Sequence, residues 1–139
     1  MNISKGMQKK FVDEIRFVAE HMETANTDQE KAYFFSAIHG MAQRIVNFEY
    51  DPELVFIHQV GQLVHNMINT GLPSIVTRQD VAGPMPEKIF SELVAVLEKM
   101  ATSIEQGQNT YYALQKMVNL AYSTTGNGRY LYLKGLLKI

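Results

Sequence analysis

The chain lacks the residues on which several classes of small protein depend. Its 139 residues include no cysteine and no tryptophan. Without cysteine there is no disulfide framework and no thiolate chemistry. No apolar run approaches the roughly 20 residues that a membrane-spanning helix needs. The sequence therefore predicts neither a disulfide-stapled scaffold nor a protein inserted in a membrane.

An excess of charge of one sign is also missing. The net charge is −1, with 13 basic and 14 acidic side chains, which argues against a protein that mainly neutralises phosphates. The balance is uneven, because residues 51–100 carry three basic and six acidic side chains and residues 101–139 carry four and one. The first ten residues lack the apolar core of a signal peptide, so we expect a cytoplasmic protein.

The remaining composition is that of an ordinary globular protein. Hydrophobic residues make up 46% of the chain and charged residues 19%. The length suits one domain with one core, so we expect a single domain over residues 1–139. Eight methionines are typical of adaptable core packing.

Apolar residues recur at helical spacing in the first half of the chain. A first helix is predicted from Ser4 to Thr24, with an apolar face of Met7, Phe11, Ile15, Val18 and Met22. A capping box of Thr27 and Glu30 opens a second, whose stripe is Phe34, Ile38, Met41, Ile45 and Phe48. Asp51 can cap a third, with Pro52 in its first turn and a buried face of Phe56, Val60, Leu63, Val64 and Met67. This third helix is predicted to stop near Gly71.

The second half predicts two or three further helices. Residues 71–86 hold three of the four prolines and are expected to be largely non-helical, with residues 77–80 able to cap one short turn. Pro86 opens the fourth helix, whose inward residues are Phe90, Leu93, Leu97, Met100 and Ile104. Asn109 caps the fifth, which carries Tyr111, Leu114, Met117, Val118 and Ala121.

The C-terminal segment leaves two readings open. The run Gly126-Asn127-Gly128 is predicted to break the chain. Residues 129–139 suit either a sixth short helix or a strand, and we favour the helix because a lone strand would have no partner. The predicted fold class is therefore all-α, a single-domain bundle of five or six helices.

The four histidines raise the question of a metal site. His58 and His65 lie seven residues apart on the third helix and share a face, while His39 lies on the second helix. Metal sites in bundle cores use inward Glu residues with Glu-x-x-His pairs, a pattern that is absent here. Helical phase places His58 and His65 opposite the predicted apolar face. We therefore predict solvated histidines, no metal and no cofactor, with contact to a partner or ligand as the alternative.

Two glycines lie inside predicted helices, where each costs about 1 kcal/mol relative to alanine. Such positions indicate a close approach to the backbone. Ser36 and Gly40 are four residues apart, off the apolar stripe of the second helix, and Gly61 lies on the third. We predict a close helix crossing or a subunit interface at the Ser36–Gly40 strip, with incidental tolerance or a ligand wall as alternatives.

The C-terminal third offers two further patterns. The residues Gly126, Asn127, Gly128 and Arg129 could form an anion-binding nest, although they match no phosphate loop, and a helix stop with a turn is the preferred interpretation. Tyrosines and basic residues are interleaved in the same third: Tyr111, Tyr112, Tyr122, Tyr130, Tyr132, Lys116, Arg129, Lys134 and Lys138. Such residues can stack bases and bind phosphates, but core and interface tyrosines explain the pattern more simply.

These patterns predict a function class and no specific reaction. The acidic residues near His21 fit the solvated face of the first helix, and no serine or threonine has the context of an activated nucleophile. We expect a non-enzymatic protein-binding or regulatory module that acts as a homodimer through the strip or the aromatic C-terminal tail. The rival hypotheses are a small helical enzyme or metal-binding bundle using His39, His58 or His65, and a subunit of a nucleic-acid-binding complex.

Overall fold

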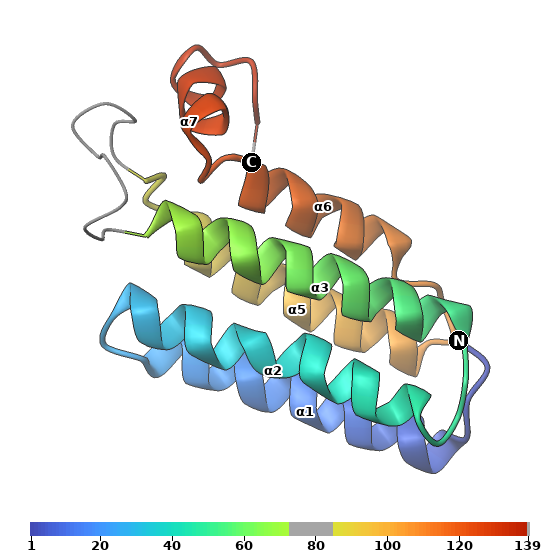
Figure 1. Cartoon of the computed structure of the whole chain (residues 1–139). Helices are drawn as coiled ribbons and strands as arrows, with labels where there is room; N and C mark the ends of the chain where they lie inside the picture. The colour runs from blue at the N-terminus through green and yellow to red at the C-terminus, as the bar shows by residue number, and fades with distance from the viewer. Residues whose placement is uncertain (73–84, 139) are drawn as a thin grey trace.

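The computed structural model describes residues 1–72 and 85–138, whose regular structure consists of α-helices without a strand (Figure 1). In chain order these are α1 (Lys5–Thr24), α2 (Asp28–Val46), α3 (Pro52–Gly71), α5 (Ile89–Glu105), α6 (Tyr111–Tyr122) and α7 (Gly126–Leu133). The all-α prediction is confirmed for this part of the chain, while the turn predicted at 77–80 lies outside it. None of the helices described is both long and apolar enough to cross a membrane.

The first three helices begin within one residue of the predicted starts, and the structure adds Ser4 to the predicted caps Thr27 and Asp51. The side chain of Ser4 accepts from the Met7 amide, that of Thr27 from the Glu30 amide and that of Asp51 from the Glu53 amide. Each satisfies a first-turn amide that has no partner within its helix. The carboxylate of Glu30 departs from the predicted box, because it accepts from the amide of Asn26. Helix α5 begins at Ile89, three residues later than Pro86.

Five helices close a ring in the order α1, α2, α3, α6, α5 and back to α1. Short connections make α1/α2, α2/α3 and α5/α6 antiparallel, and α1 and α5 also run in opposite directions (Figure 1). Because five is odd, directions cannot alternate all the way round, so one neighbouring pair must be parallel. That pair is α3 and α6: residues near both starts, Glu53 and Thr110, are bonded, as are Met67 and Thr124 near both ends.

The hydrophobic core fills this ring as one cluster of buried side chains. On α1 it contains the predicted Phe11, Ile15, Val18 and Met22. On α5 all five predicted inward residues, from Phe90 to Ile104, are buried. On α6 Leu114, Met117 and Ala121 are buried, whereas Tyr111 is 50% exposed.

On α2 and α3 the prediction is confirmed only in part: Ile38 and Ile45 on α2 and Val60 and Val64 on α3 are buried as predicted, but the core face of each helix is rotated away from the rest of the predicted stripe. The buried side chains of α3 are led by Leu54, Ile57, Val64 and Ile68, while the predicted Phe56 and Leu63 are 45% and 50% exposed. On α2, Phe35 is buried and Phe48 is 80% exposed. Both helices have more apolar residues than one face can hold, so the periodicity of the apolar residues is compatible with two rotations of each helix. Packing against both neighbours in the ring selects one of them.

The C-terminal break lies earlier than predicted. The chain turns at residues 123–125, and the glycine run forms the first turn of α7. This corrects the prediction of a stop at Gly126–Gly128 and confirms helix over strand for residues 129–133. Gly128 is required by sterics, because a Cβ there would lie 1.6 Å from the carbonyl oxygen of Tyr122. The Thr125 hydroxyl accepts from the Gly128 amide and caps the helix.

Candidate functional site

The parallel pair α3/α6 has an acidic side chain between its two N-terminal ends. Glu53 is buried, and its carboxylate accepts from both the amide and the hydroxyl of Thr110, at 2.6 and 2.8 Å. Its other oxygen lies 3.1 Å from the Met1 ammonium. A carboxylate there complements the partial positive charge of two helix N-termini.

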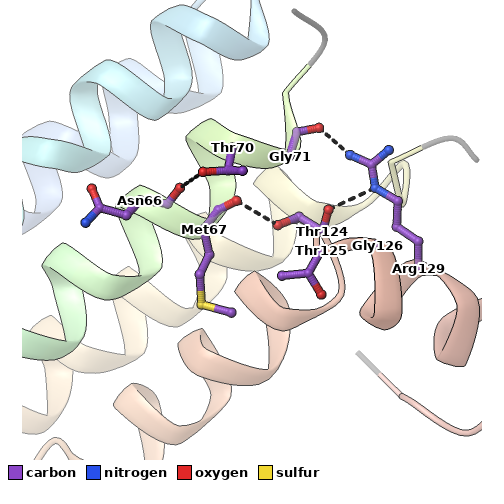
Figure 2. A pocket seen from close by; sticks show the side chains of 8 residues that line it. All are labelled: Asn66, Met67, Thr70, Gly71, Thr124, Thr125, Gly126 and Arg129. Carbon is purple, nitrogen blue, oxygen red and sulfur yellow. Dashed lines mark hydrogen bonds between the residues drawn. The ribbon is translucent and has the colours of Figure 1, made fainter. Parts of the chain in front are cut away.

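A basic side chain lies between the two C-terminal ends. Arg129 is 1% exposed, and burial lowers the pKa of its guanidinium below the usual value. Its guanidinium donates to the Gly71 carbonyl at the end of α3 and, through Nε at 2.9 Å, to the Thr124 carbonyl just past α6 (Figure 2). Unpaired carbonyls at helix C-termini are favourable acceptors for a cation. Arg129 therefore joins three helices, a role that the anion-nest hypothesis did not anticipate.

A pocket of about 300 Å³ opens beside Arg129 (Figure 2). We call it the end pocket. Its lining comes from the last turns of α3, the turn after α6 and the start of α7: Asn66, Met67, Thr70, Gly71, Thr124, Thr125, Gly126 and Arg129.

The threonine hydroxyls of the end pocket bond to the backbone around it. The hydroxyl of Thr70 donates to the carbonyl of Asn66, that of Thr124 to Ala121 and that of Thr125 to Tyr122. Since each hydroxyl is directed to a carbonyl, the threonines can present their methyl groups beside the side chain of Met67. An anion would have to displace the carbonyls that Arg129 holds, at the negative ends of two helices. The pocket therefore favours an apolar occupant.

An apolar strip runs along α3 and α6 from the end pocket toward the N-terminal ends of both helices. We call it the α3/α6 face, and it consists of Phe56, Leu63, Met67, Tyr111, Val118 and Tyr122. Each helix contributes residues at spacings of seven and four, which lie on one side of a helix. Phe56 and Tyr111 meet at the end far from the pocket, with ring centroids 5.6 Å apart and planes at 72°. The face therefore has a half-exposed aromatic pair at one end, which we call the aromatic projection, and a pocket at the other.

The α3/α6 face is almost without charge. Among the 20 residues of α3 only the buried Glu53 is acidic and none is lysine or arginine. Among the 12 residues of α6 only Lys116 is charged, and its ammonium lies 3.6 Å from a carboxylate oxygen of Glu92 on α5. The polar neighbours of the face are amides such as Gln59, Gln62 and Gln115. By contrast, the outer side of α1 carries exposed charges of both signs.

The prediction that His58 and His65 are solvated is wrong. His58 and His65 do not stand on a solvated face, because the rotation of α3 turns them toward α2. Their ring centroids lie 6.0 and 5.6 Å from that of His39, and Nδ1 of His58 donates to the His39 carbonyl at 3.1 Å. Nε2 of His39 is buried and has no hydrogen-bond partner within the described residues. Burial lowers the pKa of His39, with further lowering from His65 and His58, and burial lowers that of His65.

This cluster joins the three residues named by the metal hypothesis but does not present them as ligands. No group of three or more His, Asp or Glu side chains in residues 1–72 and 85–138 is placed to share a metal ion. Zn–N bonds of about 2.0–2.1 Å require ring nitrogens that converge on one point. The cluster instead fills the contact between α2 and α3.

The two helical glycines have different surroundings. A Cβ on Gly61 would lie 3.0 Å from the Cβ of His39, so Gly61 is where α2 and α3 approach closely. A Cβ on Gly40 would meet only the Arg44 guanidinium, at 3.5 Å. The helix crossing predicted at the Ser36–Gly40 strip is therefore not made by the part of the chain that the structure describes. A subunit interface at the strip stays a prediction.

The basic residues of the C-terminal third are dispersed among intramolecular contacts. Lys116 pairs with Glu92, Arg129 is buried, and the Lys134 ammonium lies 5.5 Å from the centre of the Tyr130 ring. Tyr111 contacts Phe56. Tyr112, Lys116 and Lys138 line one small pocket of about 220 Å³, so only a part of the predicted set of tyrosines and cations lies together. Comparison with protein-family models, curated proteins and solved structures finds no match to this chain.

Proposed function

We propose that this protein is a non-enzymatic helical protein-binding module, and that its partner docks on the α3/α6 face. The observation that carries the proposal is an apolar, nearly charge-free strip that ends in a pocket whose hydroxyls bond to backbone carbonyls. Interface cores are depleted in charged residues and enriched in aromatic residues and Met, as this face is. Contiguous exposed apolar patches on a protein usually mark a binding surface.

The composition of the face favours a protein over other partners. A nucleic acid would need cations to hold its phosphates, but Lys116 on α6 is paired with Glu92, and Arg129 at the end pocket donates to the carbonyls of Gly71 and Thr124. A metal or acid–base centre would have to use the histidine cluster, which lies on the other flank of α3, against α2. Aromatic and aliphatic side chains of a protein partner would bury Phe56, Leu63 and Tyr111 and leave few polar groups unpaired.

A photo-crosslinking amino acid at defined positions tests this proposal in the native cell. We would place it at Leu63 or Gln115 on the α3/α6 face, and at Tyr33, which is 73% exposed on α2, as the matched control. Irradiation should yield a discrete covalent adduct from the first two positions and none of comparable yield from position 33. Equal yields at all three positions, or no adduct at 63 and 115, would overturn the proposal.

A further inference from the structure

We propose that the partner on the α3/α6 face is a second copy of this chain, related by a two-fold axis that crosses α3 at Leu63 and α6 at Val118. This inference rests on the proposed function, because it names the occupant of the same face. In this arrangement the Phe56–Tyr111 pair of each copy enters the end pocket of the other. The argument uses the spacing along both helices, the size of the pocket and the charge of the face.

Along α3 the aromatic pair and the pocket lie at equal distances from the centre of the face. Phe56 is seven residues before Leu63, and Thr70 of the end pocket is seven residues after it. Seven residues correspond to about 10 Å of helix. On α6, Tyr111 precedes Val118 by seven residues, and the turn that follows the end of α6 at Tyr122 brings Thr125 into the same pocket.

A two-fold axis lying in the interface, across both helices, reverses their direction and exchanges these ends. A residue seven before the axis then faces a residue seven after it in the second copy. Phe56 faces Thr70 of the second copy, and Tyr111 faces Thr125 of the second copy. Two aromatic projections therefore meet two pockets in one interface. An axis along the helices would instead place the aromatic pairs against each other and leave both pockets unfilled.

The pocket matches the projection in volume and chemistry. Its volume is about 300 Å³, whereas a cavity of about 150 Å³ lined by apolar side chains holds one benzene ring. The pocket thus has room for two rings, and the projection consists of two. The threonine hydroxyls already bond to carbonyls, so buried rings would not leave them without partners.

The absence of charge suits a surface that pairs with itself. In a two-fold interface, residues near the axis face their own copies, so a charge there would face a like charge. Leu63 and Val118 at the proposed axis are neutral, and Gln62 and Gln115 beside them can donate and accept hydrogen bonds. Because the α3/α6 face has no excess of positive or negative charge, it favours a second copy over a strongly charged partner.

Engineered cysteines test the register directly, because the chain has none of its own. Leu63→Cys should form an intermolecular disulfide under mild oxidation, since a residue at the axis faces itself within the 7 Å or so that a disulfide allows between Cα atoms. Phe56→Cys alone should not, but Phe56→Cys combined with Thr70→Cys should. An internal bond in that double variant is excluded, because about 21 Å of helix separates the two positions. Tyr33→Cys is the control, because its disulfide yield measures the bonds that form by random collision of two chains.

Sedimentation velocity over a concentration series completes the test. The parent should be dimeric and Leu63→Asp monomeric, with helicity and thermal unfolding confirming that the variant folds. Gly40→Leu should leave the dimer intact. Three outcomes would overturn the two-fold pairing. The first is a monomeric parent, and the second is a dimer that Gly40→Leu dissociates and Leu63→Asp does not. The third is a disulfide yield of Leu63→Cys no higher than that of Tyr33→Cys.

The mass of the photo-adduct distinguishes this inference from the function on which it rests. An adduct of two copies of the chain supports both. An adduct of a different mass at position 63 leaves the binding module standing and overturns the second copy as occupant. Absence of a position-specific adduct overturns the binding module itself.

Discussion

At the scale of single residues, two glycines that both lie inside helices have different structural roles. Gly40 and Gly61 both interrupt a helix, and helix propensity assigns the same cost to each. Only Gly61 has a neighbouring helix within contact distance of a Cβ, at 3.0 Å from His39. The sequence could identify both positions as unusual but could not say which one faces another helix.

Alanine substitutions should separate these roles. Gly61→Ala should destabilise the fold by about 1–3 kcal/mol, because the added methyl overpacks the α2/α3 contact. Gly40→Ala should stabilise it by up to about 1 kcal/mol, because the flexible Arg44 side chain can move and the helix gains a better former. Urea denaturation of both variants beside the parent measures the two free energies of unfolding. Equal losses in both variants would contradict the assignment.

At the scale of elements, the contact between α2 and α3 should make stability depend on pH. The pKa values of His39 and His65 are lowered from 6.5 in the folded protein. Above pH 6.5 these rings are neutral in both states and have no effect. As the pH falls below 6.5, the unfolded chain binds protons that the folded chain does not, so the free energy of unfolding decreases. The loss levels off once the pH passes below the folded pKa values.

Chemical denaturation between pH 8 and pH 5 measures this profile. The parent should lose stability toward the acidic end of the range, and His39→Leu should show a shallower loss because it removes one of the two groups. His21→Gln is the matched control, since His21 lies on α1 outside the α2/α3 contact and bonds to the Phe17 carbonyl. A parent whose stability is flat or rises as the pH falls toward 5 would show that the cluster is not buried as described.

The parallel pair α3/α6 depends on the side chains at its ends. Arg129→Met should destabilise the fold by roughly 1–3 kcal/mol, because the carbonyls of Gly71 and Thr124 lose their donor at the C-terminal ends of two helices. Arg129→Lys should recover only part of this, since an ammonium lacks the planar fork that reaches two carbonyls. Lys134→Met, at an exposed cation in the same region, provides the control. Thermal unfolding of the three variants tests this assignment, and a loss in Lys134→Met equal to that in Arg129→Met would refute it.

At the scale of the whole molecule, the odd number of helices in the ring has a consequence for its surface. Three short hairpin connections and the α1/α5 contact run antiparallel, so α3 and α6 are left as parallel neighbours. Their N-terminal ends adjoin at Glu53 and their C-terminal ends at Arg129. The same arrangement places Phe56 beside Tyr111 and brings Thr70 and Thr125 into one pocket. The proposed binding face is thus a product of topology.

If two copies pair through this face, stability must depend on protein concentration. Unfolding of a dimer is coupled to dissociation, so the melting temperature should rise as the concentration increases. Leu63→Asp should melt at a temperature that does not change with concentration. Calorimetry over a hundredfold range of concentration distinguishes the two behaviours. A parent whose melting temperature is constant over that range would contradict the dimer at those concentrations.

The helical class and most helix limits could be predicted from local signals in the sequence. Caps at Ser4, Thr27 and Asp51 act on amides within the same turn, and glycines and prolines act on their own backbone, so these signals are local and readable. The core face of α1 was equally readable, because its apolar residues form one stripe. Helix α5, with all five predicted inward residues buried, shows the same simplicity.

The rotation of α2 and α3 follows from tertiary packing, and it sets the surroundings of the histidines and of Leu63. Each helix has more apolar residues than its core face accommodates, so the choice between Ile57 and Phe56, or between Phe35 and Phe34, depended on neighbours distant in sequence. That choice moved the histidines into the α2/α3 contact and exposed Leu63. The pairing of Arg129 with Gly71 spans 58 residues, and no local pattern encodes such a distance. Local chemistry sets where helices begin and end, while packing sets which side of each helix remains available for binding.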